Sequence, residues 1–259
     1  GSTGEALALT GDEKKAIIKF VAKFSLKGPL MIGVGGFQLE EQIAWMQFCE
    51  DYINVQAFLL VTPMYAKPGV FGQTKWFEAL LDRAHVPCML YNVPGRTAVQ
   101  LSPKVLYYLK NHNQLWALKE ASGNLEDFKE FQKANPALIM YSGDDNAVAG
   151  HVHLGAKGVV SVASNVWANA TNHYVSLCLA QKDPNFASWS TVCDALFLSS
   201  NPVPLKVLLY KKGLIKSPML RLPLVADDLT QEQVKILLAQ DQAVDAWCAT
   251  YNINQSKLT

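Results

Sequence analysis

The chain has 259 residues, of which 50% are hydrophobic and 17% are charged. This is the composition of a folded globular protein, and it excludes an intrinsically disordered chain. The formal net charge is +1, so there is no charge excess that would indicate a nucleic acid or an anionic membrane as partner. The longest apolar runs, such as 57–61, are too short to span a bilayer. We therefore expect no nucleic-acid partner and no membrane partner.

The five cysteines stand singly along the chain. An odd number without paired spacing argues against a disulfide framework and against a zinc site. The first residues lack both the basic segment and the long apolar stretch of a signal peptide. We expect a cytoplasmic protein that binds no metal ion.

Short apolar runs alternate with longer segments of helical periodicity as far as residue 163. Ser102 is expected to cap a helix that starts at Pro103, and Asn124 precedes a helix with an acidic first turn. After residue 163 only helical patterns follow. The predicted strands are 30–33, 57–62, 87–92, 115–120, 138–142 and 158–163. The predicted helices are 40–52, 75–84, 103–111, 124–133, 146–153, 171–181, 186–199, 202–212 and 231–246.

Continuous apolar strands that alternate with helices predict a parallel sheet buried on both faces. Polar residues or glycine end nearly every strand, which suits a barrel, where all these ends meet at one mouth. An open doubly wound sheet is the alternative, but no GxGxxG follows the first strand. We predict an α/β fold, a (β/α)8 TIM barrel with a C-terminal helical domain. The expected boundaries are 1–170 for the barrel and 171–259 for the helical domain. Only six strands are counted, so we expect an N-terminal strand-helix-strand unit to be missing from this sequence.

Lys119 ends a predicted strand at the barrel mouth, among apolar neighbours. Desolvation would lower the pKa of this ammonium from its reference value near ~10.4, and a neutral amine can form a Schiff base. The alternative is a lysine that reaches water or pairs with Glu120. Tyr91 ends the preceding strand and would lie beside Lys119, where its hydroxyl could shuttle protons. It could equally be a half-buried aromatic residue.

Several loops offer groups that bind carboxylates or act as caps. The Pro-Gly turn before Arg96 would aim the guanidinium over the mouth, although a solvated loop arginine fits as well. The loop 1–5 carries two hydroxyls and backbone N–H groups that suit a carboxylate. Asp144 and Asp145 lack a further ligand at metal spacing and are interpreted as loop caps. His151 and His153 are interpreted as ordinary helix residues.

Together these segments resemble the dihydrodipicolinate synthase/N-acetylneuraminate lyase family, which are lysine-dependent pyruvate aldolases on a (β/α)8 barrel. The resemblance follows the family's order over nearly the whole chain. It is carried by GSTGE (1–5), VTPMYAKP (61–68), YNVPGRT (91–97), LKEASG (118–123), YSGDD (141–145), GAKGVVSV (155–162), NPVPLK (201–206) and LRLPL (220–224).

The resemblance implies a role for each matching residue. Lys119 would form the Schiff base with pyruvate, with no metal or other cofactor. Arg96 would hold the carboxylate of aspartate semialdehyde, and it separates synthases from sugar-acid lyases of the family. The proton relay would be Tyr91, Thr3 and Tyr65, with Tyr65 reaching into a neighbouring subunit's site. Ser2 and Thr3 would bind the pyruvate carboxylate, and the backbone of Gly143 and Val160 would line the site.

The implied reaction condenses pyruvate with aspartate semialdehyde in lysine and diaminopimelate biosynthesis, in a homotetramer built as a dimer of dimers. One alternative is another pyruvate-dependent aldolase or lyase of the family. The other is a catalytically inactive, truncated barrel that acts as a binding module. Positions matching the family's lysine-binding allosteric pocket include Ala6, Gly11, Lys14 and Met64, and the cation and thioether predict weak or absent inhibition by lysine.

Overall fold

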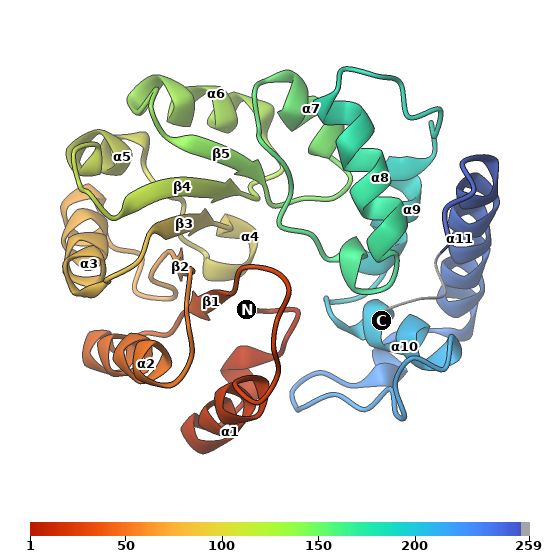
Figure 1. Cartoon of the computed structure of the whole chain (residues 1–259), viewed down its shortest axis with the longest axis horizontal. Coiled ribbons are helices and arrows are strands. Elements are labelled where there is room, and N and C mark those ends of the chain that lie inside the picture. Colours follow the sequence, from red (N-terminus) through yellow and green to blue (C-terminus); the bar gives the residue numbers. More distant parts are fainter. Residues whose placement is uncertain (255–259) are drawn as a thin grey trace. The chain divides into compact units, whose positions relative to one another are not determined.

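The computed structural model describes residues 1–254 (Figure 1). Its contacts divide the chain into two compact units. The first comprises Gly1 and Leu9–Tyr141, and the second comprises Ser2–Ala8 and the chain from Ser142 onward. The domain boundary expected at 170/171 stays a prediction.

The first unit is built on a sheet whose strands follow the chain order, β1-β2-β3-β4-β5, with parallel pairing from β1 to β4. Because successive parallel strands need a crossover, a helix follows each strand. The strands confirm five of the six predicted ones, with ends that differ by at most one residue. They are β1 (Met31–Val34), β2 (Ala57–Val61), β3 (Cys88–Asn92), β4 (Leu115–Glu120) and β5 (Ile139–Ser142).

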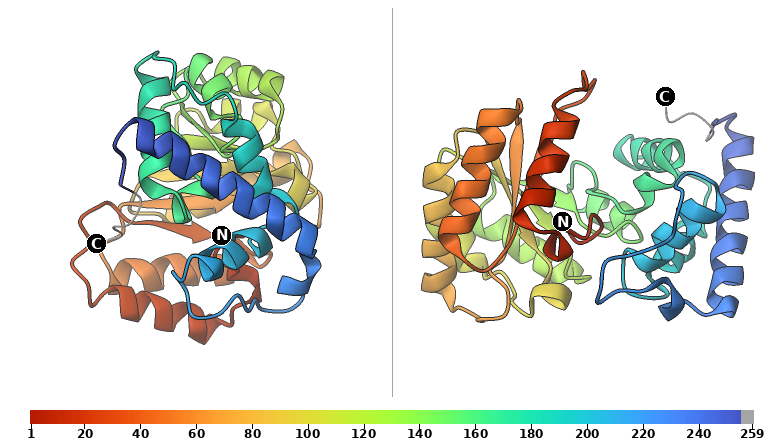
Figure 2. Two further views of the ribbon diagram at one scale, coloured as in Figure 1. Left: turned by 90° about the vertical axis from the view of Figure 1, so that its right-hand side faces the viewer. Right: turned by 90° about the horizontal axis from the view of Figure 1, so that it is seen from below.

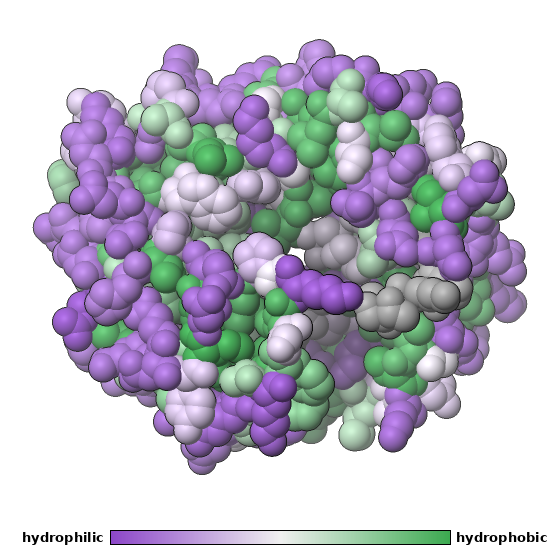
Figure 3. Space-filling view, viewed as in Figure 1, coloured by the Kyte–Doolittle hydropathy of each residue, from purple (hydrophilic) through white to green (hydrophobic). Residues whose placement is uncertain are grey.

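The crossover helices α2, α3, α5 and α6 form one layer against a face of this sheet (Figure 1). Their inner sides bury aromatic and leucine side chains such as Phe77, Leu81, Phe128 and Phe131. The outward sides of α2 and α3 carry mainly hydrophilic side chains (Figure 3), so burial of one helical face holds the layer in place. The helices of this unit are α1 (Gly11–Val21), α2 (Leu39–Tyr52), α3 (Val70–Arg83), α4 (Pro94–Thr97), α5 (Pro103–Leu109) and α6 (Leu125–Ala134).

Three details of this unit correct the sequence analysis. Helix α1 was not predicted, although Thr10 and Glu13 form a capping box at its start, which is a readable signal. Helix α3 begins at Val70 rather than at residue 75. Ser102 makes no side-chain cap bond to α5, so the fixed φ of Pro103, rather than a cap, marks the start of that helix. The acidic first turn predicted after Asn124 is present in α6, and Asn124 also caps this helix, since its Oδ1 accepts the N–H of Glu126 at 3.0 Å.

In the second unit, the predicted strand 158–163 is wrong. Only an isolated bridge joins Val159 to Ser142. The carboxylate of Asp145 accepts the N–H groups of Val162 and Ala163 at 2.7 and 3.1 Å, which starts the 3-10 turn η2 (Ala163–Asn165) instead of a strand. Asp145 is thus a loop cap, as the sequence suggested.

From Ala168 to Thr250, the regular structure of the second unit is helical, as predicted. Trp189 stacks on Tyr174 with ring centroids 4.3 Å apart, and Phe186 stacks on Trp247 at 5.0 Å. Helices α10 and α11 pack side by side (Figure 2). The helix predicted at 186–199 is shorter and ends in the 3-10 turn η3 (Ala195–Phe197). The helices are α7 (Val148–His153), α8 (Ala168–Leu179), α9 (Trp189–Asp194), α10 (Val203–Lys211) and α11 (Gln231–Thr250). A further 3-10 turn, η4, covers Ala226–Asp228.

The fold is therefore α/β, with a parallel sheet and a C-terminal helical segment. Within residues 1–254, no helix combines the length and the apolar character needed to cross a bilayer.

Candidate active site

Tyr91 and Lys119 lie next to each other at the carboxyl ends of β3 and β4. The register pairs them directly across the two strands. Lys119 is only 9% exposed, and its Nζ lies 4.1 Å from the centroid of the Tyr91 ring, which is a cation–π distance. The strand spacing predicted this neighbourhood correctly. A surface lysine that reaches water is excluded by the burial.

Adjacent residues of a strand point to opposite faces, so Asn92 and Glu120 face away from Tyr91 and Lys119. They are also register partners, and both are fully buried. The Asn92 amide Nδ2 donates to Glu120 Oε2 at 2.7 Å. A buried polar pair thus lies behind Tyr91 and Lys119, on the other face of the same two strands.

The loop between β3 and α5 carries Arg96. Pro94 starts the single turn α4 rather than the tight Pro-Gly turn expected from the sequence, and Ala98 ends it with a φ of 56°. The Arg96 N–H donates to Val93 O at 2.9 Å. The Thr97 hydroxyl lies 2.9 Å from Val99 O, so the turn that presents Arg96 is braced internally.

Tyr65 lies in the loop after β2, with a φ of 70° and 87% exposure. Its N–H donates to Thr97 O at 3.2 Å. The hydroxyl of Thr62, which directly follows β2, donates to Thr97 Oγ1 at 3.3 Å. Thr97 therefore fastens the loop of Tyr65 to the loop of Arg96.

The hydroxyl residues Ser2 and Thr3 belong to the second unit. Thr3 Oγ1 accepts the Asn201 Nδ2 at 2.9 Å, which leaves the Thr3 proton for another acceptor. Glu5 Oε1 accepts Lys206 Nζ at 2.7 Å, and its other oxygen accepts the Arg221 N–H at 2.7 Å. Partners from the C-terminal helical segment thus hold the loop 1–5.

Gly143 and Val160 also lie in the second unit, on either side of the bridge at Ser142. The Val160 N–H donates to Ser142 O at 2.9 Å. The Ser142 Oγ lies 2.7 Å from His151 Nδ1, and burial lowers the pKa of this imidazole. His151 is therefore more than a helix histidine, because it fixes the strand end that leads into Gly143.

The ion pair of Glu5 yields a test of how the loop 1–5 is held. Burial alone would raise the pKa of Glu5, but Lys206 and the Arg221 N–H outweigh it and hold that pKa below the reference of 4.5. The stabilisation is therefore present above about pH 4.5 and is lost as the pH falls through the lower, folded pKa. We expect Glu5→Gln to lower the free energy of unfolding by about 1–2 kcal/mol at neutral pH, a loss that fades in acid.

Thermal unfolding of wild type and Glu5→Gln, compared from neutral pH down to about pH 3, measures this effect. Glu232→Gln is the matched control, because its pair with Lys235 is exposed at both ends. A difference in melting temperature that is the same at every pH would contradict the ionic explanation.

Several residues of these networks were not singled out from the sequence, although each stands within a quoted motif: Thr97, Asn92, Glu120, Asn201 and Lys206. Some of these residues could have been predicted from the sequence. A polar residue at the end of a buried strand needs a partner, and Asn92 and Glu120 stand at that position. No such signal exists for Asn201 and Lys206, because their partners are about 200 residues away in the sequence.

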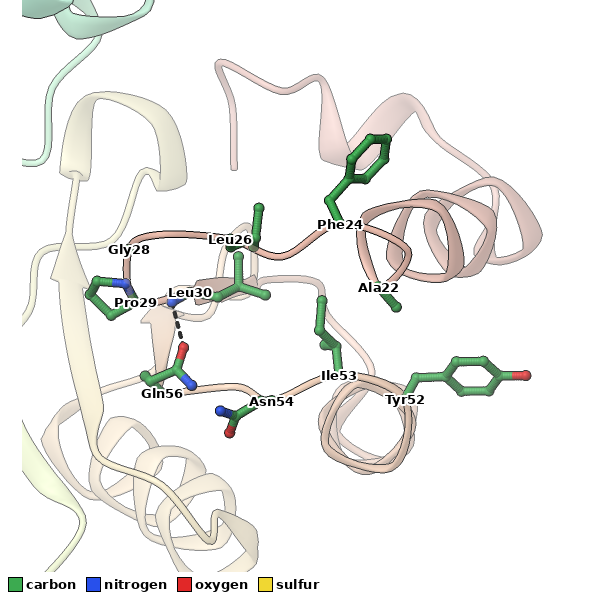
Figure 4. A pocket seen from close by; sticks show the side chains of 10 residues that line it. All are labelled: Ala22, Phe24, Leu26, Gly28, Pro29, Leu30, Tyr52, Ile53, Asn54 and Gln56. Carbon is green, nitrogen blue, oxygen red and sulfur yellow. Dashed lines mark hydrogen bonds between the residues drawn. The ribbon is translucent and has the colours of Figure 1, made fainter. Parts of the chain in front are cut away.

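A pocket in the first unit lies at the opposite, amino ends of the strands (Figure 4). The end of α1, the segment before β1 and residues 52–56 line it, without a charged side chain. Its lining residues offer no amine that could form a Schiff base and no cationic side chain that could bind a carboxylate. In the part of the chain described, residues 1–254, no three His, Cys, Asp or Glu side chains are grouped to hold a metal ion.

Known proteins resemble this chain over most of its length. The model of the dihydrodipicolinate synthetase family matches residues 1–241. A curated relative from Francisella philomiragia, named 4-hydroxy-tetrahydrodipicolinate synthase, is 45% identical over 249 residues, which are 95% of this chain and 83% of the relative.

Two solved structures extend the likeness to the fold. The 4-hydroxy-tetrahydrodipicolinate synthase from Methylacidiphilum fumariolicum SolV matches with a TM-score of 0.91 and 27% identity, over 97% of this chain and 85% of that one. The chloride-inhibited dihydrodipicolinate synthase from Acinetobacter baumannii, complexed with pyruvate, matches with a TM-score of 0.85 and 30% identity, over 95% and 85%. These structures are (β/α)8 barrels, which confirms the predicted fold class. The chain belongs to the dihydrodipicolinate synthetase family.

Proposed function

We propose that this chain is a 4-hydroxy-tetrahydrodipicolinate synthase, which condenses pyruvate with L-aspartate 4-semialdehyde through a Schiff base on Lys119. The observation that carries the proposal is the buried lysine paired with Tyr91 at the carboxyl ends of two parallel strands. The names of the relatives support the same reaction. The product belongs to lysine and diaminopimelate biosynthesis, and we place the enzyme in the cytoplasm.

The first step joins pyruvate to the enzyme. The neutral amine of Lys119 attacks the ketone carbon of pyruvate and forms a carbinolamine. A relay of Tyr91, Thr3 and Tyr65 protonates the hydroxyl, which leaves as water, and an iminium remains. Ser2 and Thr3 hold the pyruvate carboxylate through N–H groups and hydroxyls, and the backbone of Gly143 and Val160 lines the site.

The second step forms the new carbon–carbon bond. The iminium nitrogen accepts electrons, so the methyl group loses a proton and an enamine results. The enamine carbon attacks the aldehyde of aspartate semialdehyde, whose carboxylate Arg96 binds as a bidentate partner. The amine of the product then attacks the iminium carbon, closes the ring and releases Lys119. Each bond is made and broken within the two substrates and the lysine, so no further cofactor enters.

The exposure of Tyr65 is relevant to the oligomeric state of the protein. Its side chain is 87% exposed on the first unit, which suits a role in the site of a neighbouring subunit. This exposure supports a homo-oligomer, and the resemblance to the family is the basis for proposing a tetramer built as a dimer of dimers. If Tyr65 acts across such an interface, dissociation into monomers abolishes most of the activity.

Incubation of the purified chain with pyruvate and aspartate semialdehyde tests the proposal, with the heterocyclic product followed by NMR. The family's other aldolases and lyases are distinguished by offering sugar-derived aldehydes in place of aspartate semialdehyde. With pyruvate present, we expect the chain to turn over aspartate semialdehyde and none of the sugar-derived aldehydes. Turnover only of other aldehydes would overturn the substrate assignment, and no turnover by a folded chain would favour a binding module.

Feedback by lysine is expected to be weak or absent. Lys14 and Met64 stand at matching positions of the regulatory pocket, and neither a cation nor a thioether attracts the ammonium groups of lysine. A titration of the condensation with L-lysine measures this, with L-leucine as the control for unspecific effects. Half-inhibition at submillimolar lysine would contradict the expectation.

A further inference from the structure

The Asn92–Glu120 pair forms a fully buried hydrogen-bonded bridge behind the reactive side chains. Both residues have 0% exposure, and they are register partners across β3 and β4. Each also bonds to a backbone N–H beyond its own strand. The Leu101 N–H donates to Asn92 Oδ1 at 2.9 Å, and the Ser122 N–H donates to Glu120 Oε1 at 2.6 Å.

These partners fix the chemical state of the bridge. Because Asn92 Oδ1 accepts from Leu101, its Nδ2 must point at Glu120, where it donates to Oε2. Both oxygens of Glu120 therefore accept an N–H, which is the arrangement of an ionised carboxylate. Burial raises the pKa of this carboxyl, and the donors from Ser122 and Asn92 offset part of that effect.

The bridge closes the base of the loop that presents Arg96. This loop leaves β3 after Asn92 and returns to the same side chain at Leu101. Ala121 adds a backbone bond to Asn92 O at 2.9 Å, so the turn after β4 is tied to the same point. Between these ties stands the α4 turn with Arg96, whose N–H donates to Val93 O.

We propose that Asn92 and Glu120 are positioning residues, which hold the Arg96 loop in the geometry that binds the carboxylate of the second substrate. The inference rests on the proposed function, because it assigns Arg96 to aspartate semialdehyde. The bridge acts through the loop and touches no reacting atom. Loss of the bridge therefore weakens the binding of the second substrate, aspartate semialdehyde, and leaves formation of the pyruvate Schiff base intact.

The bridge allows a reversal test with isosteric side chains. Glu120→Gln sets one amide N–H₂ against another, and Asn92→Asp sets two carboxylates against each other. The double variant Asn92→Asp/Glu120→Gln satisfies every donor again. In it, the new carboxylate at position 92 would accept from Leu101 and from the amide at position 120, whose oxygen would accept from Ser122. The net charge of the bridge is also restored.

We expect each single variant to raise KM for aspartate semialdehyde by about 10-fold to 100-fold, since a buried donor or acceptor is left unpaired. The rate of borohydride-trapped adduct formation with pyruvate should change by less than about twofold. The double variant should return KM to within about threefold of wild type. Gln56→Met is the matched control, because it removes a first-unit bond to the Leu30 N–H at the opposite strand ends (Figure 4).

Single variants with wild-type KM would overturn the proposal. The proposal would also be overturned if the single variants raised KM and slowed adduct formation by the same factor, and if Gln56→Met did the same while its melting temperature equalled theirs. The Asn92–Glu120 pair would then contribute only to stability. A wild-type chain that forms no adduct with pyruvate refutes the proposed function instead. In that case, the single and double variants still report the bridge through the protection of the Leu101 and Ser122 amides against hydrogen exchange.

Discussion

Replacement of Lys119 by methionine is expected to abolish the condensation, with kcat lowered at least about a thousandfold, as with loss of the nucleophile in other covalent enzymes. Methionine keeps the length and the apolar stem of the side chain but lacks the amine that forms the carbinolamine. Because Lys119 is buried against the ring of Tyr91, an apolar side chain fits the same space and the variant should remain folded. Initial rates at saturating substrates, with thermal unfolding alongside, measure both effects.

Lys104→Met is the matched control, since Lys104 is exposed on α5 of the same unit. It should leave both kcat and the melting temperature unchanged. If Lys119→Met retained more than about a tenth of the wild-type rate, the amine would not be the nucleophile and the Schiff-base mechanism would fail.

Replacement of Arg96 by alanine is expected to lower kcat/KM for aspartate semialdehyde about 100-fold or more. A bidentate, charge-assisted contact contributes about 1.5–3 kcal/mol per hydrogen bond, and alanine removes the whole fork. Arg96→Lys keeps the charge without the fork, so we expect an intermediate loss of about 10-fold. Steady-state kinetics with each substrate varied separately measure these losses.

The loss at Arg96 should be confined to the second substrate. Trapping of the pyruvate adduct should stay within about twofold of wild type in both variants, because in the proposed mechanism pyruvate reacts before the aldehyde binds. Arg83→Ala, an exposed change in the last turn of α3, controls for a general loss of positive charge. If pyruvate trapping fell by the same factor as kcat/KM, Arg96 would act in formation of the pyruvate adduct, and its assignment to aspartate semialdehyde would be contradicted.

The local order of the first unit could be predicted from the sequence because it depends on neighbouring residues. The periodic apolar runs gave five strands almost to the residue, and the spacing of Tyr91 and Lys119 predicted that they are neighbours. The motif 91–97 gave the loop of Arg96 but not its shape, since a proline followed by glycine suits a turn and a first helical turn alike.

The remainder depends on contacts between residues far apart in the sequence. The run 158–163 has the composition of a strand, yet the carboxylate of Asp145 binds the N–H groups of Val162 and Ala163, where the 3-10 turn η2 begins. Likewise, nothing near Thr3 or Glu5 shows that Asn201 and Lys206 hold them. These hydrogen-bond partners come together only when the chain is folded, so the local pattern of residues does not predict them.

The most direct test of the central claim is borohydride reduction in the presence of pyruvate, followed by intact mass and peptide mapping. We predict one reduced pyruvyl group per chain, attached to Lys119 and absent both from Lys119→Met and from samples without pyruvate. A folded wild-type chain that gains no adduct, or that gains one on a different lysine, would contradict the assignment of Lys119 as the Schiff-base residue.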